Sequence, residues 1–176
     1  MKTLLTDTET VGQPKPAGAG PAKKRLLLVD DDPAIRQIVM RLLAEEGYAV
    51  LTAVNGVEAL VLVAGMKFDL VVLDLNLPVK GGWDTFKQLT TEHPLLPIIL
   101  ITARPNQIFP ALAAGAGALL AKPLDFVILF DTIRALLEER PELRQARISG
   151  RPARFHYSPP QLGGPPGAGT QPEAAL

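Results

Sequence analysis

The chain has 176 residues, of which 47% are apolar, and this length is typical of one domain with a single hydrophobic core. Eighteen basic residues balance eighteen acidic ones, so the overall charge gives no indication of binding to nucleic acid or to an anionic membrane. The absence of cysteine excludes disulfides, thiol chemistry and cysteine-ligated metals. No apolar run reaches the roughly 18 residues of a membrane-spanning helix, and the first residues lack a signal-peptide core, so we expect a soluble, cytoplasmic protein.

The two ends of the chain differ in composition from its middle. Residues 1–24 close with GQPKPAGAGPAKK, a stretch rich in Gly, Pro, Ala and Lys that predicts a flexible arm. Residues 141–176 hold seven prolines and five glycines, which predicts a mostly disordered tail. We therefore expect one folded domain over residues 25–140.

Five short apolar runs follow one another within residues 25–140. They are RLLLVD (25–30), YAVLTA (48–53), FDLVVLD (68–74), PIILIT (97–102) and GALLAK (117–122). Their hydrophobicity is continuous rather than alternating, which is typical of strands buried on both faces.

The longer amphipathic segments between these runs are predicted helices. They cover residues 33–47, 55–66, 83–93 and 125–140. In the remaining segment, Pro105 and Pro110 confine the helix to one or two turns before Gly115. The alternation predicts an α/β fold of the (βα)5 type, a doubly wound, five-stranded parallel sheet with helices on both faces.

Polar side chains stand at the carboxyl ends of four predicted strands: Asp30 to Asp32, Asp74, Thr102 and Lys122. In open α/β sheets this edge binds ligands, so we expect the side chains to converge there. Each pair of carboxylates about 4 Å apart costs about 4 kcal/mol at an effective dielectric constant near 20, so the cluster requires a cation. Oxygen ligands without His or Cys favour Mg²⁺. With the lysine and the hydroxyl, the set suits phosphorylation of Asp74 as the nucleophile.

Four motifs follow one another at the ends of these strands: LLLVDDDP, VVLDLNLPVKGGW, ITAR and AKPL. In this order and at near-usual spacing they resemble the receiver domain of two-component response regulators, across roughly residues 24–140. The resemblance implies a flavodoxin-like fold and transfer of a phosphoryl group to an aspartate.

The resemblance also implies a role for each acidic residue. It makes Asp74 the acceptor of a phosphoryl group from a histidine kinase or a phosphotransfer protein. It implies that Asp31 binds Mg²⁺ directly, that Asp30 does so mostly through water, and that Asn76 offers its backbone carbonyl oxygen to the metal.

The same resemblance assigns the contacts to the phosphoryl group. It implies that the Thr102 hydroxyl and the Ala103 backbone N–H hold phosphoryl oxygens and that Lys122 pairs with them. It also predicts a cis peptide bond before Pro123. One position departs from the family, because Leu119 stands where receivers often have an aromatic side chain that turns inward on activation. We therefore do not expect that coupled movement in this chain.

A phosphatase of the haloacid-dehalogenase type is the first alternative, because LLLVDDDPA contains Asp-x-Asp after an apolar run. It would use Asp30 as the nucleophile and Asp32 as the general acid. Against it, Ala34 occupies a position where that family has Thr or Val, the chain has no room for a cap domain, and Asp74 would have no role. The second alternative is a receiver scaffold that binds partners without phosphate. The complete set of acidic, hydroxyl and lysine residues argues against it.

We therefore expect a stand-alone response regulator rather than an enzyme. The 36 residues after residue 140 are too few for a DNA-binding or catalytic output module of ordinary size. Such a protein would bind an unidentified downstream protein or act as an intermediate in a phosphorelay. In the ligand-free protein the adjacent carboxylates repel one another, so we expect a neutral residue at Asp30 or Asp31 to stabilise the fold.

Overall fold

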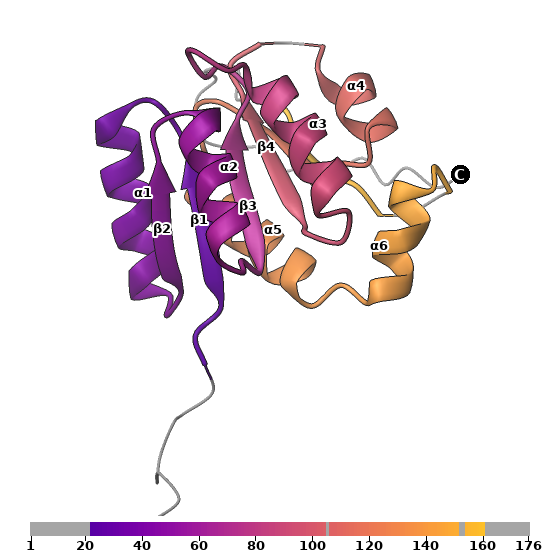
Figure 1. The fold of residues 1–176 in the computed structure, drawn as a ribbon, viewed down its shortest axis with the longest axis horizontal. Coiled ribbons are helices and arrows are strands. Elements are labelled where there is room, and N and C mark those ends of the chain that lie inside the picture. The colour runs from indigo at the N-terminus through magenta and orange to yellow at the C-terminus, as the bar shows by residue number, and fades with distance from the viewer. Residues whose placement is uncertain (1–21, 105, 152–153, 161–176) are drawn as a thin grey trace, which may run out of the picture.

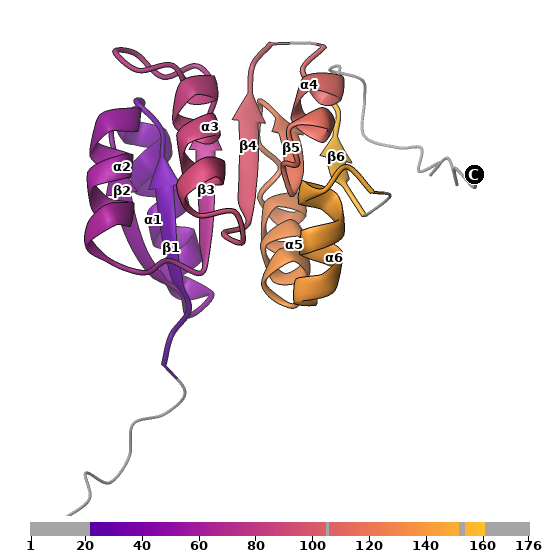
Figure 2. The same cartoon turned by 45° about the vertical axis from the view of Figure 1, so that its right-hand side comes forward.

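Residues 22–104, 106–151 and 154–160 are described by this computed structural model, and they form one parallel sheet with helices on both faces (Figure 1, Figure 2). The strands are β1 (Arg25–Val29), β2 (Ala49–Ala53), β3 (Leu70–Asp74), β4 (Ile98–Thr102), β5 (Ala118–Ala121) and β6 (His156–Ser158). The helices are α1 (Pro33–Glu45), α2 (Gly56–Gly65), α3 (Gly82–Glu92), α4 (Ile108–Ala113), α5 (Phe126–Leu137) and α6 (Pro141–Ile148).

The sheet has the strand order β2-β1-β3-β4-β5-β6, and every neighbouring pair is parallel. Its first five strands match the five apolar runs to within two residues at either end, which confirms the predicted doubly wound α/β class. The central strands β3 and β4 are buried along their whole length, because helices cover both faces of the sheet.

Each face of the sheet has its own apolar core. Successive side chains of a strand point to opposite faces. Leu27 and Val29 of β1 belong to the core shared with α2, α3 and α4, whereas Leu26 and Leu28 belong to the core shared with α1 and α5. In Figure 1, α2 and α3 lie in front of the sheet and α5 lies behind it.

The third aspartate of the DDDP motif, Asp32, caps the start of helix α1. One carboxylate oxygen of Asp32 accepts hydrogen bonds from the backbone N–H groups of Ala34, at 2.8 Å, and Ile35, at 3.3 Å. Pro33 occupies the first turn, where its missing N–H costs no hydrogen bond. Asp32 is therefore a helix cap, and only the first two aspartates of the motif remain for the site.

The described helices range from six residues in α4 to 13 in α1, and none is long and apolar enough to cross a membrane. The short α4 is as predicted: Pro110 lies in its first turn, and the chain leaves it at Gly115. Gly115 has a φ of 76°, a left-handed conformation that favours glycine. Pro105, the other proline of the prediction, lies outside the described residues.

Part of the expected disordered tail is folded, so that expectation is wrong for residues 141–151 and 154–160. Helix α6 begins at Pro141, where a first-turn proline is tolerated, and β6 adds a sixth parallel strand beside β5. Figure 2 shows α6 beside α5 and β6 beside β5. Residues 161–176 and the expected arm up to residue 21 lie outside the described residues.

The side chains of Arg144 and Arg147 hold α6 in place. The Arg147 guanidinium donates to both oxygens of Glu139, at 2.5 and 2.9 Å, and the side chains are only 4% and 7% exposed. Arg144 donates to the backbone carbonyl oxygens of Leu95, at 2.8 Å, and Leu136, at 3.0 Å. These contacts join α6 to the segment before β4 and to α5, and a count of prolines and glycines cannot reveal them.

Glu139→Gln should lower the free energy of unfolding by about 3 kcal/mol, because it leaves the buried Arg147 guanidinium without a counter-charge. Urea unfolding measured by circular dichroism gives the change. Glu45→Gln is the matched control, since Glu45 pairs with Arg41 on the exposed surface of α1 and its loss should cost no more than about 0.5 kcal/mol. Equal losses in the two variants would show that the buried pair does not anchor α6.

Candidate functional site

Three carboxylates meet where β1 and β3 end. Asp30 and Asp31 follow β1, Asp74 is the last residue of β3, and the two strands are neighbours in the sheet. One carboxylate oxygen of each lies within 4.8 Å of those of the other two. Asp30 and Asp74 are 0% and 1% exposed, whereas Asp31 is open to solvent. The structure thus brings together the acidic residues that the sequence places at this edge.

Lys122, just beyond β5, bridges the two buried carboxylates. Its ammonium group lies 2.6 Å from an oxygen of Asp74 and 3.0 Å from an oxygen of Asp30. Burial acts to lower the pKa of Lys122, but the hydrogen bonds and charges of the two carboxylates outweigh it, and the pKa is raised above its ordinary value. The lysine therefore stays protonated and offsets part of the repulsion between the aspartates.

Backbone N–H groups satisfy the remaining oxygens of the buried carboxylates. The second oxygen of Asp74 accepts from the N–H of Asn76 at 2.8 Å, and the second oxygen of Asp30 accepts from the N–H of Asp32 at 2.9 Å. Each buried carboxylate thus has partners on both oxygens, which is the condition for burying such a group at a tolerable cost.

Thr102 and Ala103 lie at the end of the neighbouring strand, β4. The Thr102 side chain is buried, and its hydroxyl oxygen accepts a hydrogen bond from the N–H of Arg104 at 3.0 Å. Among the described residues the hydroxyl hydrogen has no acceptor, so it can turn and donate to another group. Ala103 is exposed beside it. Both predicted residues are therefore at the same edge of the sheet as the carboxylates.

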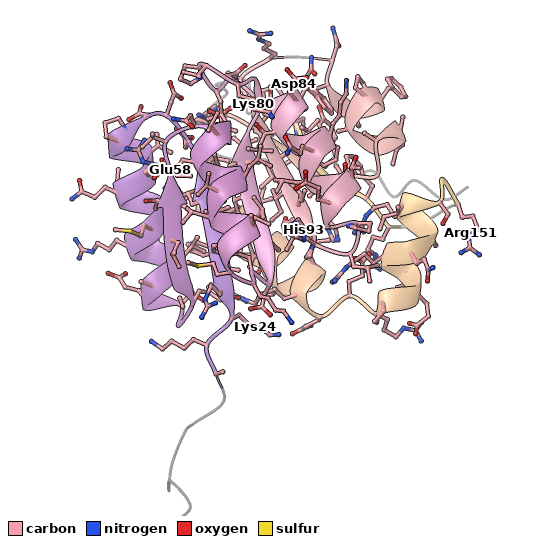
Figure 3. All side chains as sticks on the ribbon, in the orientation of Figure 1. Lys24, Glu58, Lys80, Asp84, His93 and Arg151 are labelled. Atoms are coloured by element: carbon pink, nitrogen blue, oxygen red, sulfur yellow. The ribbon has the colours of Figure 1, made fainter. Side chains whose placement is uncertain are left out.

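The segment between β3 and α3 is held close to the end of β3. Gly82 begins α3, and a Cβ atom there would clash with the carbonyl oxygen of Asp74 and with the Cα atom of Leu75. The Lys80 ammonium donates to the side-chain oxygen of Gln88 at 2.6 Å and ties the loop to α3. Figure 3 labels Lys80 at the upper end of the molecule, where β3 ends. Gly82 of the KGGW motif is therefore required for close approach.

Trp83 joins this segment to the one that follows β4. Its indole N–H donates to the side-chain oxygen of Gln107 at 3.0 Å, and its ring meets Phe86 edge to face with 5.8 Å between centroids. Gln107 is the residue before α4. The sequence gives no local signal for this link, because the two residues are 24 positions apart.

Three further positions bear on the resemblance. The Lys122–Pro123 bond is cis, as the resemblance predicts. Leu119 is 2% exposed and packs in the core beneath α2, α3 and α4. Arg36, which the sequence analysis passed over, donates to the backbone carbonyl oxygen of Asp30 at 2.7 Å. Its place in the first turn after the DDDP motif was the signal available.

A family model agrees with the site and the fold. The model of the response regulator receiver domain matches residues 26–134, more than half of the chain. The chain belongs to the response regulator receiver domain family. It is thus a receiver of the two-component type, and membership implies interaction with a histidine kinase or a phosphotransfer partner.

Curated relatives of this receiver include response regulators named MprA. The one from Mycobacterium sp. (strain KMS) is 42% identical over 115 residues, which cover 64% of this chain and 50% of that protein. The one from Mycobacterium avium (strain 104) is 40% identical over 121 residues, which cover 67% and 53%. The chain therefore spans about half the length of the curated relatives it matches.

Solved structures of receivers share the fold. A receiver domain protein (CheY-like) from Methanospirillum hungatei JF-1 has a TM-score of 0.65 and 31% identity, over 69% of this chain and 98% of that one. The response regulator TrrA from Thermotoga maritima, solved in complex with Mg²⁺ and BeF, has a TM-score of 0.60 and 34% identity, over 64% and 98%.

Gly82→Ala should lower the free energy of unfolding by about 1–3 kcal/mol, because the added methyl group displaces the backbone that follows Asp74. Gly65→Ala is the control. A Cβ atom at Gly65, the last residue of α2, meets nothing within 4 Å, so this variant should be neutral or up to about 1 kcal/mol more stable. Chemical denaturation of the two variants provides the comparison, and an unaffected Gly82→Ala would show that close approach is not required there.

Asp30 and Asp31 have different surroundings, so replacing each by asparagine should change the free energy of unfolding in opposite directions. Asp30 is paired with Lys122, which removes the reason to expect stabilisation there, and Asp30→Asn should cost about 1–3 kcal/mol. Asp31 is exposed beside two carboxylates, so Asp31→Asn should add up to about 1 kcal/mol to the free energy of unfolding. Thermal unfolding in excess chelator measures both, and a destabilised Asp31→Asn would contradict the assignment of repulsion to Asp31.

Proposed function

We propose that this receiver accepts a phosphoryl group on Asp74 from a histidine kinase or a phosphotransfer protein. One observation carries the proposal: Asp74 is a buried carboxylate at a ligand-binding edge of the sheet, held by Lys122 and by the N–H of Asn76 and faced by two further carboxylates. These surroundings fit a carboxylate that acts as a nucleophile better than one that only packs in the core.

The transfer is a displacement at phosphorus. A carboxylate oxygen of Asp74 forms the new bond to phosphorus, the bond between phosphorus and the imidazole nitrogen of the donor breaks, and its electron pair leaves with the nitrogen. Water later cleaves the acyl phosphate, which returns the carboxylate and inorganic phosphate. The domain is in this view a phosphoacceptor that returns to its starting state, and it does not turn over a separate substrate.

Mg²⁺ fits the donor set of this receiver. The cluster of Asp30, Asp31 and Asp74 offers only carboxylate oxygens, which suit a hard divalent cation, and its exposed member leaves an entry from solvent. Asp31 would bind the ion directly, Asp30 mostly through water, and Asn76 through its backbone carbonyl oxygen. A bound Mg²⁺ would neutralise charge on the phosphoryl oxygens.

The remaining residues act on the phosphoryl oxygens. Lys122 already lies 2.6 Å from Asp74, so its ammonium is placed to pair with an oxygen of a group attached there. The Thr102 hydroxyl has its hydrogen free to donate, and the Ala103 N–H lies at the exposed end of the same strand. These three donors would orient the phosphoryl group and favour the phosphorylated state.

The output of the receiver is a change in partner binding or onward transfer of the phosphoryl group in a relay. The match covers about half the length of the curated relatives, so only the receiver part of those proteins supports the proposal. The TrrA structure contains Mg²⁺ and BeF, and its similarity to this chain supports a test with the same compound.

Asp74→Asn should abolish labelling by radioactive acetyl phosphate in the presence of Mg²⁺, a loss of at least about 100-fold, because the amide is not a competent nucleophile. Asp32→Asn is the matched control: it changes the same functional group at a helix cap, asparagine caps as well as aspartate, and labelling should persist. Phosphate incorporated per chain is the measurement.

Full labelling of Asp74→Asn would refute the assignment of the acceptor. If Asp30→Asn then lost its labelling, the phosphatase alternative with Asp30 as nucleophile would replace it. If the wild-type protein took up no phosphate and bound no beryllofluoride, the scaffold alternative would stand.

A further inference from the structure

Arg36 contacts the loop that carries the two leading aspartates. It lies in the first turns of α1, and its guanidinium donates to the backbone carbonyl oxygen of Asp30 at 2.7 Å, in a partly buried position. Its own N–H donates to the backbone carbonyl oxygen of Asp32 at 3.0 Å as part of the helix. Arg36 thus donates hydrogen bonds to the residue before Asp31 and to the residue after it.

The residues on either side of Asp31 are hydrogen-bonded at most of their polar atoms. The N–H of Asp30 donates to the carbonyl oxygen of Ala53 at 3.3 Å, and its two carboxylate oxygens accept from the N–H of Asp32 and from Lys122. Within the described part of the chain, the Asp31 carboxylate has neither a hydrogen bond nor an ion pair. The contacts of Asp30 and Asp32 therefore hold the backbone on either side of Asp31, and the Arg36 contact holds the carbonyl group of the Asp30–Asp31 peptide.

We propose that Arg36 is a positioning residue for the metal site, which holds the Asp30–Asp31 peptide so that the free Asp31 carboxylate faces Asp74. This inference rests on the proposed function, because it concerns the Mg²⁺ site of that function. Residues that orient metal ligands typically affect metal affinity by 10- to 100-fold.

The hydrogen bond of Arg36 would favour Mg²⁺ binding, whereas its positive charge would oppose it. A guanidinium near the cluster repels Mg²⁺, so removing its charge alone should tighten Mg²⁺ binding. Removing its hydrogen bond should loosen the loop and weaken Mg²⁺ binding. The two effects differ in sign, so the direction of the change in affinity separates a positioning role from a merely electrostatic one.

The experiment is a titration of the full chain with MgCl₂ at constant ionic strength, followed by the amide NMR shifts of residues 30–34 and 74–77. Arg36→Met removes the charge and the donors and should raise the dissociation constant about tenfold. Arg36→Lys keeps the charge and one donor and should recover part of the affinity. Arg41→Met removes a charge from the exposed face of the same helix and should leave the dissociation constant unchanged.

The outcomes separate the two proposals. Wild-type protein that binds no Mg²⁺ would overturn the proposed function and this inference with it. Wild-type protein that binds Mg²⁺, together with an Arg36→Met variant that binds as tightly or more tightly, would overturn the positioning role alone. Arg36→Gln, whose side chain is too short to reach the carbonyl, provides the same test if Arg36→Met does not fold. In each variant, the free energy of unfolding measured in chelator should change less than the free energy of Mg²⁺ binding.

Discussion

The contact of Lys122 with Asp74 and Asp30 is the interaction on which the rest of this receiver depends. Two buried carboxylates on neighbouring strands would be intolerable without a cation, and the lysine reaches them from beyond β5, two strands away from β3. The contact forms only if β1, β3, β4 and β5 stand in this order with their carboxyl ends aligned. The fold and the site are therefore specified by the same residues.

The lysine offsets only part of the negative charge that the cluster carries. Three carboxylates face one ammonium group, so two negative charges remain uncompensated at the end of the sheet. The remaining charge attracts a divalent cation. The division of labour follows from burial: Asp30 and Asp74 are tied to the lysine and to backbone N–H groups, whereas the exposed Asp31 remains available.

The sequence predicted the strands and the residues of the site for one physical reason. Strands buried on both faces are continuously apolar, so a polar residue such as Asp74 or Thr102 at a strand end stands out. The sequence analysis predicted neither α6 nor β6, because the contacts that hold them carry no local signal. Examples are the bond from Arg144 to the carbonyl oxygen of Leu95, 49 positions away, and the pairing of β6 with β5. It also gave no measure of the pairing of Asp30 with Lys122, because proximity among carboxylates was inferred from the motif whereas the pairing depends on atomic geometry.

Leu119 and β6 together restrict how this receiver can respond to phosphate on Asp74. Leu119 is buried in one of the two cores, and its neighbour in the sheet is Tyr157 of β6, which covers the edge of β5. A buried leucine does not alternate between an exposed and a buried position, and it has no polar group that could change partner. Its contacts therefore differ little between the phosphorylated and unphosphorylated states. The other path from the site leads from Thr102 into the segment before α4, where Gln107 accepts the hydrogen bond of the Trp83 indole. Since Trp83 directly follows Gly82, which packs against the backbone of Asp74, this hydrogen bond links the segment after β3 to the start of α4. The site is thus connected to α4 through Trp83 and to β5 through Lys122.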